Sequence, residues 1–567
     1  MILKTLYDYY NRCGNLPAKG MEEKEIGFLI VLSPEGQFLR FEDCRTGKDH
    51  ARVYLVKKHV GRSSAAVANY LYDNSAYVLG FSDKNSEKEQ LYFDTFKEKV
   101  ESIAEEYPDN KDIKAIKLFY DNSREDIKDI ISQDPLWEDI KKNLSKKYST
   151  FSFRIEGDLK IVAEKKEILQ LEDCDDETKT DSLCLVSGKH GPSVDTTTAT
   201  MIPGSQATAK LVAFQVNSGY DSYGKTKCGN APISEEAEFA YTTALNSMLQ
   251  KGSRNKFMLG TRTFVFWASN NNEASKEAEE SLFGLLGFQE ENNDDPNANL
   301  MKVRKVFESI YSGILKTGLD DKFYILGLAP NSARIAVVYW SETTLKDFAE
   351  KILKHFSDME IHDTRKDKKP YMGIREIISS VTLGGKLSDA TPNLPEAVVK
   401  SIFQGLPYPA TLYSACLRRI RVEQKLTITR AAIIKAFLNR QSNNNKMIEI
   451  MLDKDNNNQG YLCGRLFAVL DKIQEDANNI SSIRERYMNA ASATPSAVFA
   501  TILNLSVHHS EKLDEGRRIY FEKLKQEILD KVSADGFPTH LDLQDQGRFF
   551  VGYYHQRQDF FTSKKEQ

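Results

Sequence analysis

Apolar and polar positions alternate in short runs over the first third of the chain, and this pattern predicts strands. The segment 25–43, EIGFLIVLSPEGQFLRFED, has two apolar runs around a Pro-Glu-Gly turn, which predicts a β-hairpin because proline and glycine favour tight turns. Further strands are expected at 52–58 and 77–82. From about 87 to 107 the apolar residues recur three or four apart, which predicts a helix. Residues 1–185 are therefore expected to form an α+β region.

Residues 186–391 show a second alternation of strand and helix patterns. Apolar runs predict strands at 209–216, 261–268, 323–330 and 334–340. The segment 268–299 is rich in Asn, Glu and Asp, so it has little apolar surface to bury and is expected to be a mobile surface insertion. The region as a whole is expected to be α+β.

Beyond about Pro392 the strand pattern ends and helical periodicity continues almost to the C-terminus. Thr494-Pro495 marks a helix start, because threonine can cap and a first-turn proline gives up no needed hydrogen bond. Apolar stripes of this kind are typical of a bundle core. The predicted fold class is an α+β N-terminal portion with short antiparallel strands and helices, followed by an all-α helical bundle domain at 392–567.

Composition narrows the class of protein. The chain has 567 residues, 41% of them hydrophobic and 28% charged, which is typical of a soluble globular protein with several domains. We find no apolar run long enough for a membrane span and no signal-peptide pattern, so a cytoplasmic protein is expected. Its seven cysteines are scattered and never form a C-x2-C pair, which argues against a disulfide framework or a cysteine zinc site.

Catalytic signatures are mostly absent. There is no phosphate-binding loop, nucleophile elbow or Cys/His pattern. The dipeptide His362-Asp363 is the one hint of a metal-dependent nuclease, but its hydrophilic surroundings are unlike the interior in which metal ligands usually gather. We expect a protein without enzymatic activity, cofactor or metal, and a nuclease using His362 and Asp363 stays the alternative.

Positive charge is concentrated between Leu406 and Arg440 in a chain whose formal charge is −4. Seven basic residues stand there against one acid, Glu423. Such a stretch is typical of a surface that binds a polyanion, because bound phosphates release counterions. The alternative is a solvated pair of helices, since charge runs are usually ordinary surface.

Eight strings along the chain, in order, resemble one known family, the large subunit of the type I-C CRISPR Cascade complex. They are RSSAAVANYLYDNSAYVLG (62–80), CLVSGKHGP (184–192), SYGKTKCGNAPIS (222–234), FYILGLAPNSARIAV (323–337), LPYPATLYSACLRRIR (406–421), IKAFLNR (434–440), YLCGRLFAVLDKIQ (461–474) and GYYHQRQDFF (552–561). The sequence departs from the family at 193–203, where SVDTTTATMIP is rich in hydroxyl residues, and in the Asn-rich segment 268–299.

The resemblance implies a non-catalytic subunit that recognises the PAM duplex flanking a DNA target, promotes duplex opening and guide RNA pairing, and holds the displaced strand in antiviral defence. Its partners would be guide RNA, double-stranded DNA, the Cascade backbone and handle-binding subunits, and a helicase-nuclease recruited after target binding. Such a complex leaves sequence recognition to base pairing. A scaffold that touches only protein is a further alternative.

Candidate residues for the duplex are amides and glycines, because Asn and Gln can use a donor and an acceptor on a base edge. The first group is Asn69 and Asn74 with Lys57, Lys58 and Arg62, although Asn69 could instead close a turn. Related large subunits use a glycine-rich loop and a glutamine wedge, so the resemblance implies these roles for Gly204 and Gln206. A plain connecting turn is the competing interpretation. The full second group is Gly204, Ser205, Gln206, Asn217, Ser222, Tyr223 and Gly224, of which Gly204, Ser205, Gln206, Asn217 and Tyr223 are the main candidates.

For the displaced strand the candidates are Arg418, Arg419, Arg421, Arg430, Lys435 and Arg440, because Arg418 and Arg421 share a helix face and Arg430 begins a second helix. The resemblance also implies a small helical subunit. We therefore predict that residues 447–567 are made separately by internal initiation at Met447, with Met451 as the second choice.

Overall fold

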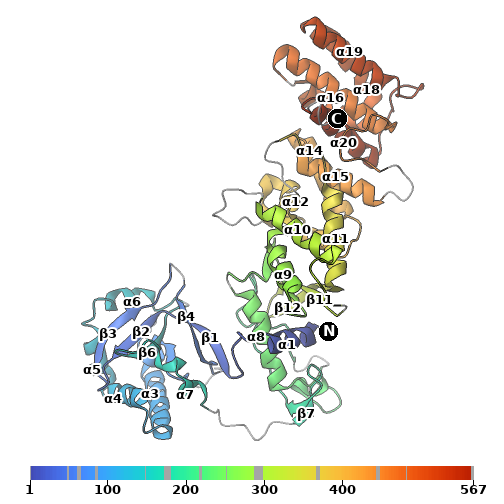
Figure 1. Ribbon diagram of the computed structural model, residues 1–567. Helices are drawn as coiled ribbons and strands as arrows, with labels where there is room; N and C mark the ends of the chain where they lie inside the picture. Colours follow the sequence, from blue (N-terminus) through green and yellow to red (C-terminus); the bar gives the residue numbers. More distant parts are fainter. Residues whose placement is uncertain are drawn as a thin grey trace.

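The computed structural model describes residues 2–47, 50–60, 66–82, 87–146, 148–171, 181–215, 220–250, 252–285, 298–318, 320–365, 371–441, 447–480 and 482–562. Figure 1 shows an elongated molecule, with an N-terminal α+β body at one end and the last five helices at the other. The predicted fold class is confirmed, since strands are confined to the N-terminal and middle parts of the described chain and helices make up its C-terminal part.

The N-terminal body is built around the buried strand β2 (Phe28–Leu32). It pairs antiparallel with β3 (Phe38–Asp43), which confirms the predicted hairpin, and parallel with β6 (Thr150–Ile155). Gly36 in the hairpin turn has φ +81°, and a Cβ there would lie 2.6 Å from the Ala115 carbonyl oxygen, so the turn requires glycine.

The other elements of this body form a ribbon, one sheet edge and a layer of helices. They are β1 (Met21–Ile26), β4 (Arg52–Lys57), β5 (Tyr72–Asn74), α2 (Ser75–Val78), α3 (Glu89–Glu106), α4 (Lys111–Tyr120), α5 (Arg124–Ile131), α6 (Trp137–Asn143) and α7 (Lys166–Leu169). The strand predicted at 77–82 is wrong: Asn74 caps α2 there, and the chain then turns at Gly80 with φ +68°.

The middle part contains a four-stranded antiparallel sheet in the order β12-β11-β10-β9. Its elements are α1 (Ile2–Arg12), β7 (Asp181–Leu183), β8 (His190–Pro192), α8 (Glu235–Leu249), β9 (Lys256–Leu259), β10 (Arg262–Ala268), α9 (Glu273–Leu285), α10 (Ala298–Ser312), β11 (Lys322–Asn331), β12 (Arg334–Thr344) and α11 (Leu345–Met359). Three of the four predicted strands of this region are confirmed.

Two predictions for the middle part are wrong. The segment 209–216 is not a strand where it is described, and only Lys210 bridges to Arg334. Residues 273–285 are not a loose insertion but helix α9, which buries Ala274, Ala278 and Leu282 in the core. The acidic and Asn-rich composition concealed these apolar residues, which lie four apart. Residues 286–297 lie outside the described part.

The described residues of the C-terminal part form helices and connecting loops, without a strand. It consists of α12 (Ile374–Ser380), α13 (Leu394–Phe403), α14 (Ala410–Glu423), α15 (Ile428–Gln441), α16 (Gln459–Asn478), α17 (Ser482–Ala493), α18 (Pro495–Ser510), α19 (Glu515–Leu529) and α20 (Leu543–Asp559), with short 3₁₀ turns between α12 and α13 at Leu383–Gly385 and Leu387–Asp389. Two further 3₁₀ turns lie in the N-terminal body at Val162–Glu164 and in the middle part at Lys227–Asn230. The predicted helix start at Thr494-Pro495 is confirmed by α18.

Buried side chains form three clusters. One fills the N-terminal body between Ile26 and Leu171. A second joins α1 to α8 and to one face of the middle sheet, so α1 packs with the middle part although it opens the chain. The third extends from Phe257 to Tyr554 without interruption, so the middle sheet and the helical part share one core across the expected boundary at 391.

Helices α16 and α20 approach unusually closely. A Cβ added at Gly464 would lie 1.9 Å from the Phe549 carbonyl oxygen, and one at Gly552 would lie 2.3 Å from that of Tyr461. Only glycine allows the two backbones to come together at these positions. No helix within the described ranges combines the length and apolar character that crossing a bilayer requires. The six cysteines described are free thiols.

Candidate nucleic-acid interface

The basic stretch predicted to bind the displaced strand forms helices α14 and α15. Its second half is turned inward. Arg430 is buried, donates hydrogen bonds of 2.9 Å to the Ser380 and Lys425 carbonyl oxygens, and forms an ion pair of 2.6 Å with Glu423. Its guanidinium is therefore occupied within the protein and is not offered to a strand.

Arg440 and Lys435 are also placed in the interior. Arg440 is paired with Asp358, donates 2.6 Å to the Ser401 carbonyl oxygen, and stacks 4.2 Å from the centre of the Tyr408 ring. Lys435 is buried, and desolvation lowers the pKa of its ammonium. The sequence predicted an exposed row of cations along α15, and this prediction is wrong. Arg430 and Arg440 form ion pairs inside the protein and Lys435 is buried, so these charges pack α15 against its neighbours.

The end of α14 keeps accessible positive charge. Arg418 is exposed and Arg421 is half-buried beside the neutral amide of Gln546, whereas Arg419 is paired with Glu423 at 2.9 Å. Lys425 follows the helix and is exposed. Among the described residues Arg418, Arg421 and Lys425 have no carboxylate partner within ion-pair distance.

Helix α17 adds a fourth cation to this place. Gln424 donates 2.6 Å to the Glu485 carbonyl oxygen, and Asn489 donates 3.2 Å to that of Arg421, so the start of α17 lies against the end of α14. The exposed Arg486 comes with it. We call Arg418, Arg421, Lys425 and Arg486 the junction patch. Sequence reasoning missed Arg486 because it lies far along the chain in a run of mixed charge, SSIRERY.

The first group of duplex candidates is mostly structural. Lys57 is 2% exposed, and its ammonium binds the Leu171 carbonyl oxygen and lies 4.2 Å from the Tyr70 ring centre. Asn69 is buried and its side chain accepts 2.9 Å from the Val60 amide, so the turn-closing alternative accounts for it. These two side chains are not on the surface, because each forms a hydrogen bond with a backbone group inside the N-terminal body.

The remaining members of that group differ in accessibility. Asn74 is exposed, and its side-chain oxygen caps α2 by accepting 3.0 Å from the Ala76 amide. Lys58 is half-buried and donates 3.1 Å to Thr198, which links the N-terminal body to the middle part. Arg62 lies outside the described residues.

The second group forms an exposed turn. Gly204 has φ +84°, a left-handed conformation that favours glycine, and the turn lies beside the Pro330 ring at the end of β11. The Ser205 hydroxyl donates 2.8 Å to the Ile202 carbonyl oxygen and closes the turn. Gln206 is exposed, and its backbone N–H donates a hydrogen bond of 3.4 Å to the Ser332 carbonyl oxygen in the β11–β12 hairpin.

Tyr223 lies at the tip of a second loop of the middle part. Its side chain is 94% exposed, and its φ of +58° is unusual for a residue with a Cβ. Asn230 anchors this loop by donating 2.9 Å to the Tyr220 carbonyl oxygen and 3.1 Å to that of Ser222. The loop therefore holds an aromatic ring in solvent. Asn217 lies outside the described residues.

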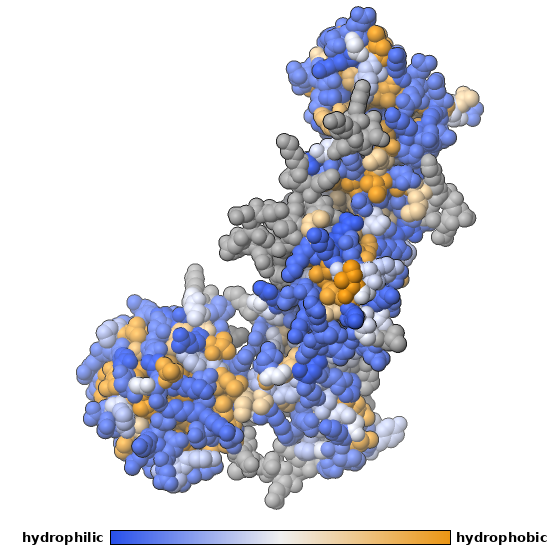
Figure 2. All heavy atoms as spheres, in the orientation of Figure 1, coloured by the Kyte–Doolittle hydropathy of each residue, from blue (hydrophilic) through white to orange (hydrophobic). Residues whose placement is uncertain are grey.

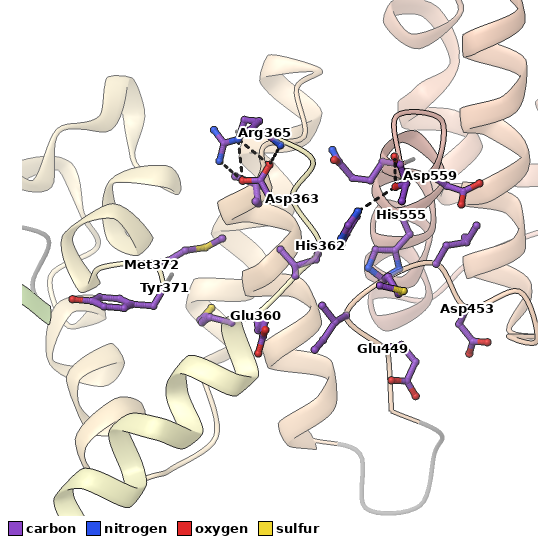
Figure 3. Close-up of a pocket in the computed structure, with 18 of the residues that line it drawn as sticks. Glu360, His362, Asp363, Arg365, Tyr371, Met372, Glu449, Asp453, His555 and Asp559 are labelled. Atoms are coloured by element: carbon purple, nitrogen blue, oxygen red, sulfur yellow. Dashed lines mark hydrogen bonds and ion pairs between the residues drawn. The ribbon is translucent and has the colours of Figure 1, made fainter. Parts of the chain in front are cut away.

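The dipeptide of the nuclease alternative lines a pocket, shown in Figure 3, between the loop after α11 and the end of α20. His362 is 3.1 Å from the Thr562 hydroxyl, and Arg365 binds both carboxylate oxygens of Asp363, at 2.9 and 2.7 Å. Within the described ranges, no group of three or more His, Cys, Asp or Glu side chains is placed to hold a metal ion. The arrangement gives the nuclease alternative no support.

The architecture is that of an elongated α+β protein with exposed polar loops next to a four-stranded middle sheet and a helical C-terminal part. The face shown in Figure 2 is largely hydrophilic. A family model described as CRISPR-associated protein (Cas_Csd1) matches residues 6–561. The chain therefore belongs to the Csd1 family of CRISPR-associated proteins. No match was found among curated proteins.

Proposed function

We propose that this chain is the non-catalytic large subunit of a type I-C CRISPR Cascade complex, in which it recognises the PAM duplex, promotes its opening and holds the displaced strand. The observation that carries the proposal is the family match over residues 6–561, which covers both the loop-bearing middle part and the helical part. The proposed partners are guide RNA, the DNA target, the backbone and handle-binding subunits, and a recruited helicase-nuclease.

The turn at Gly204–Gln206 and the loop at Tyr223 are the proposed duplex-contacting elements. Both lie on the middle part, and both are exposed and anchored, the turn by Pro330 and the loop by Asn230. A turn whose backbone can approach closely suits a groove, and an exposed ring suits stacking on a base pair that has opened. Asn74 is the proposed contact on the N-terminal body.

The junction patch is the proposed contact for the displaced strand. A strand of unpaired DNA needs accessible positive charge and not base-specific contacts. Its four members replace the row predicted from the sequence, of which Arg418 and Arg421 remain. Because the patch combines α14 with α17, a strand bound there would bridge the two parts of the helical region.

The test uses the complex assembled with guide RNA and its neighbouring subunits. Gln206→Ala and Tyr223→Ala are compared with Gln170→Ala and Tyr311→Ala, which replace exposed residues of the same types elsewhere. Affinity is measured for a target duplex carrying a selected flank and for the same target strand alone. The first pair is expected to weaken duplex binding by about 5- to 100-fold and leave single-strand binding unchanged. Equal affinity of all four variants for the duplex would contradict the assignment.

A further inference from the structure

The pocket beside His362 and Asp363 has features that the proposed function does not use. Its volume is about 1200 Å³, above the roughly 300–1000 Å³ of small-molecule pockets. It is walled by the loop after α11, the start of α12, the stretch 449–455 and the end of α20 (Figure 3), and Met301 and Arg304 of α10 also line it. It therefore lies where the C-terminal helices meet the rest of the helical part.

Methionines are prominent in its apolar lining, which also contains Ile361, Tyr371, Ile428, Ile450 and Leu452. Four of the eleven methionines of the chain, Met301, Met359, Met372 and Met451, line this one pocket. Met301 and Met451 are 45% and 48% exposed, and Ile450 beside them is 39% exposed. Flexible thioether side chains adapt to an apolar partner, and adjoining exposed apolar residues mark interaction sites.

Carboxylates surround this lining. Glu360 and Glu449 are exposed and make no ion pair with another described residue, while two of the cationic residues in the wall are already paired, Arg304 with Glu308 at 3.0 Å and Arg365 with Asp363 at 2.7 Å. The acidic residues that line the pocket are Glu360, Asp363, Glu376, Glu449, Asp453, Asp455 and Asp559. The pocket thus carries an excess of negative charge, which repels nucleic acid.

A buried imidazole also lines the pocket. His555 is 1% exposed; its Nδ1 lies 2.9 Å from the Tyr461 hydroxyl, and its Nε2 has no hydrogen-bond partner among the described residues. Burial lowers the pKa of His555 to about 3, so the ring is neutral and adds no positive charge. A buried polar atom left without a partner at the pocket wall indicates a place where a ligand can donate or accept a hydrogen bond.

We propose that this pocket is a docking site for a basic amphipathic helix of a partner protein. The apolar face of such a helix would contact the methionines, while its Lys and Arg side chains would reach Glu360 and Glu449. A methionine-rich lining ringed by carboxylates is complementary to such a helix in both polarity and charge. The proposal does not depend on DNA binding and concerns a surface opposite in charge to the junction patch.

The test measures binding of the full chain to a fluorescent amphipathic peptide of Leu and Lys, about 18 residues or five helical turns long. A peptide of the same composition in scrambled order is the control for helix amphipathicity. Glu360→Gln/Glu449→Gln is expected to weaken binding about fivefold, and Met451→Gln about threefold. The matched variant Glu35→Gln/Glu98→Gln, which changes two exposed carboxylates of the N-terminal body, is expected to bind like the unaltered chain.

Several outcomes would overturn the docking site. Equal binding of the ordered and scrambled peptides would show a general attraction to acidic surface, as would equal losses in the pocket and control variants. Displacement of the peptide by an equimolar amount of spermine would make the pocket a site for free polycations. Thermal unfolding of each variant checks that it is folded, and retained DNA binding by the pocket variants separates this proposal from the proposed function.

Discussion

Arg430 and Glu423 form an ion pair of 2.6 Å that fastens the start of α15 to the end of α14. Arg419 shares the same carboxylate at 2.9 Å. The only acid in the basic stretch is thus used to neutralise two of its cations, and this single relationship divides the stretch into a structural half and an accessible half.

Replacing Arg430 is therefore expected to affect folding. Arg430→Ala leaves Glu423 with one partner and the Ser380 and Lys425 carbonyl oxygens without their donor, so we expect a loss of about 2–3 kcal/mol in the free energy of unfolding. Arg418→Ala, at an exposed site on α14, is expected to change it by less than about 0.5 kcal/mol. Urea unfolding measures both. Equal stability of the two variants would show that the Arg430 contacts do not hold α15.

Charge reversal in the junction patch is expected to weaken binding of single-stranded DNA of any sequence. In Arg418→Glu/Lys425→Glu/Arg486→Glu, the slope of log affinity against log salt should fall by roughly one unit per lost contact. Lys111→Glu/Lys114→Glu/Lys166→Glu reverses three exposed cations of the N-terminal body and is the control. If the two triple variants had the same slope of log affinity against log salt, the junction patch would not be the contact for the displaced strand.

The contact between α16 and α20 predicts a severe effect from one methyl group. Gly464→Ala places a Cβ 1.9 Å from the Phe549 carbonyl oxygen, so the helices must separate, and we expect destabilisation above about 3 kcal/mol. Gly516 lies in α19, and a Cβ there would be 3.4 Å from the Asp514 carboxylate, which is an ordinary contact distance. Gly516→Ala is therefore expected to be neutral or stabilising by up to about 1 kcal/mol. Thermal melting distinguishes them, and a folded, fully stable Gly464→Ala protein would disprove the close approach.

Cys184 is expected to make stability depend on pH. Burial alone would raise the pKa of its thiol, but hydrogen bonds from Ser187 and Ser234 outweigh burial and lower the pKa to about 7. The Ser187 and Val186 amides lie 3.4 Å from the sulfur. A pKa that is lower in the folded state stabilises the protein fully above the unfolded-state value near 9, and this contribution is lost as pH falls through about 7.

The stability advantage over Cys184→Ser should therefore grow between pH 7 and pH 9 in reducing buffer. Cys44 is the control, because burial raises the pKa of its thiol. The pH dependence of stability therefore has the opposite sign there: the neutral thiol is favoured in the folded state, and any stability advantage over Cys44→Ser declines at high pH. Urea midpoints at several pH values measure both. A constant difference between the unaltered chain and Cys184→Ser would show that no thiolate forms.

Internal initiation at Met447 predicts a second, short product. Met447 lies just before the last five helices, and Met447 to Gln567 comprises 121 residues that include α16–α20. An immunoblot against the C-terminus is expected to show this species beside the full chain, and recoding Met447 should abolish it. Recoding Met451, the second choice, should leave it. A single full-length band would reject the separate small subunit.

Local sequence patterns predicted much of the architecture. The β2–β3 hairpin, the strands β4, β10, β11 and β12, the helix α3 and the change to helices after Pro392 were all readable, because each depends on a short-range periodicity or turn. The family was also readable from strings in order. The prediction failed at 77–82, where Tyr77, Val78 and Leu79 are buried without forming a strand, and at 209–216, where Ala209 is the only buried residue among those described and the rest are half-buried or exposed. It also failed at α9, whose buried alanine and leucine residues were concealed by acidic neighbours.

The candidate site divides in the same way. The sequence by itself determined which residue types were available: amides and glycines in the loops, a tyrosine between serine and glycine, and a basic stretch ending at Arg440. Only the tertiary structure decided which of the charges reach solvent. The partners of Arg440 are Asp358, Ser401 and Tyr408, and the hydrogen bond from Gln424 to the Glu485 carbonyl oxygen holds the start of α17, which carries Arg486, against the end of α14. A long charged side chain is exposed or buried according to distant groups that satisfy it, and no local pattern contains those groups.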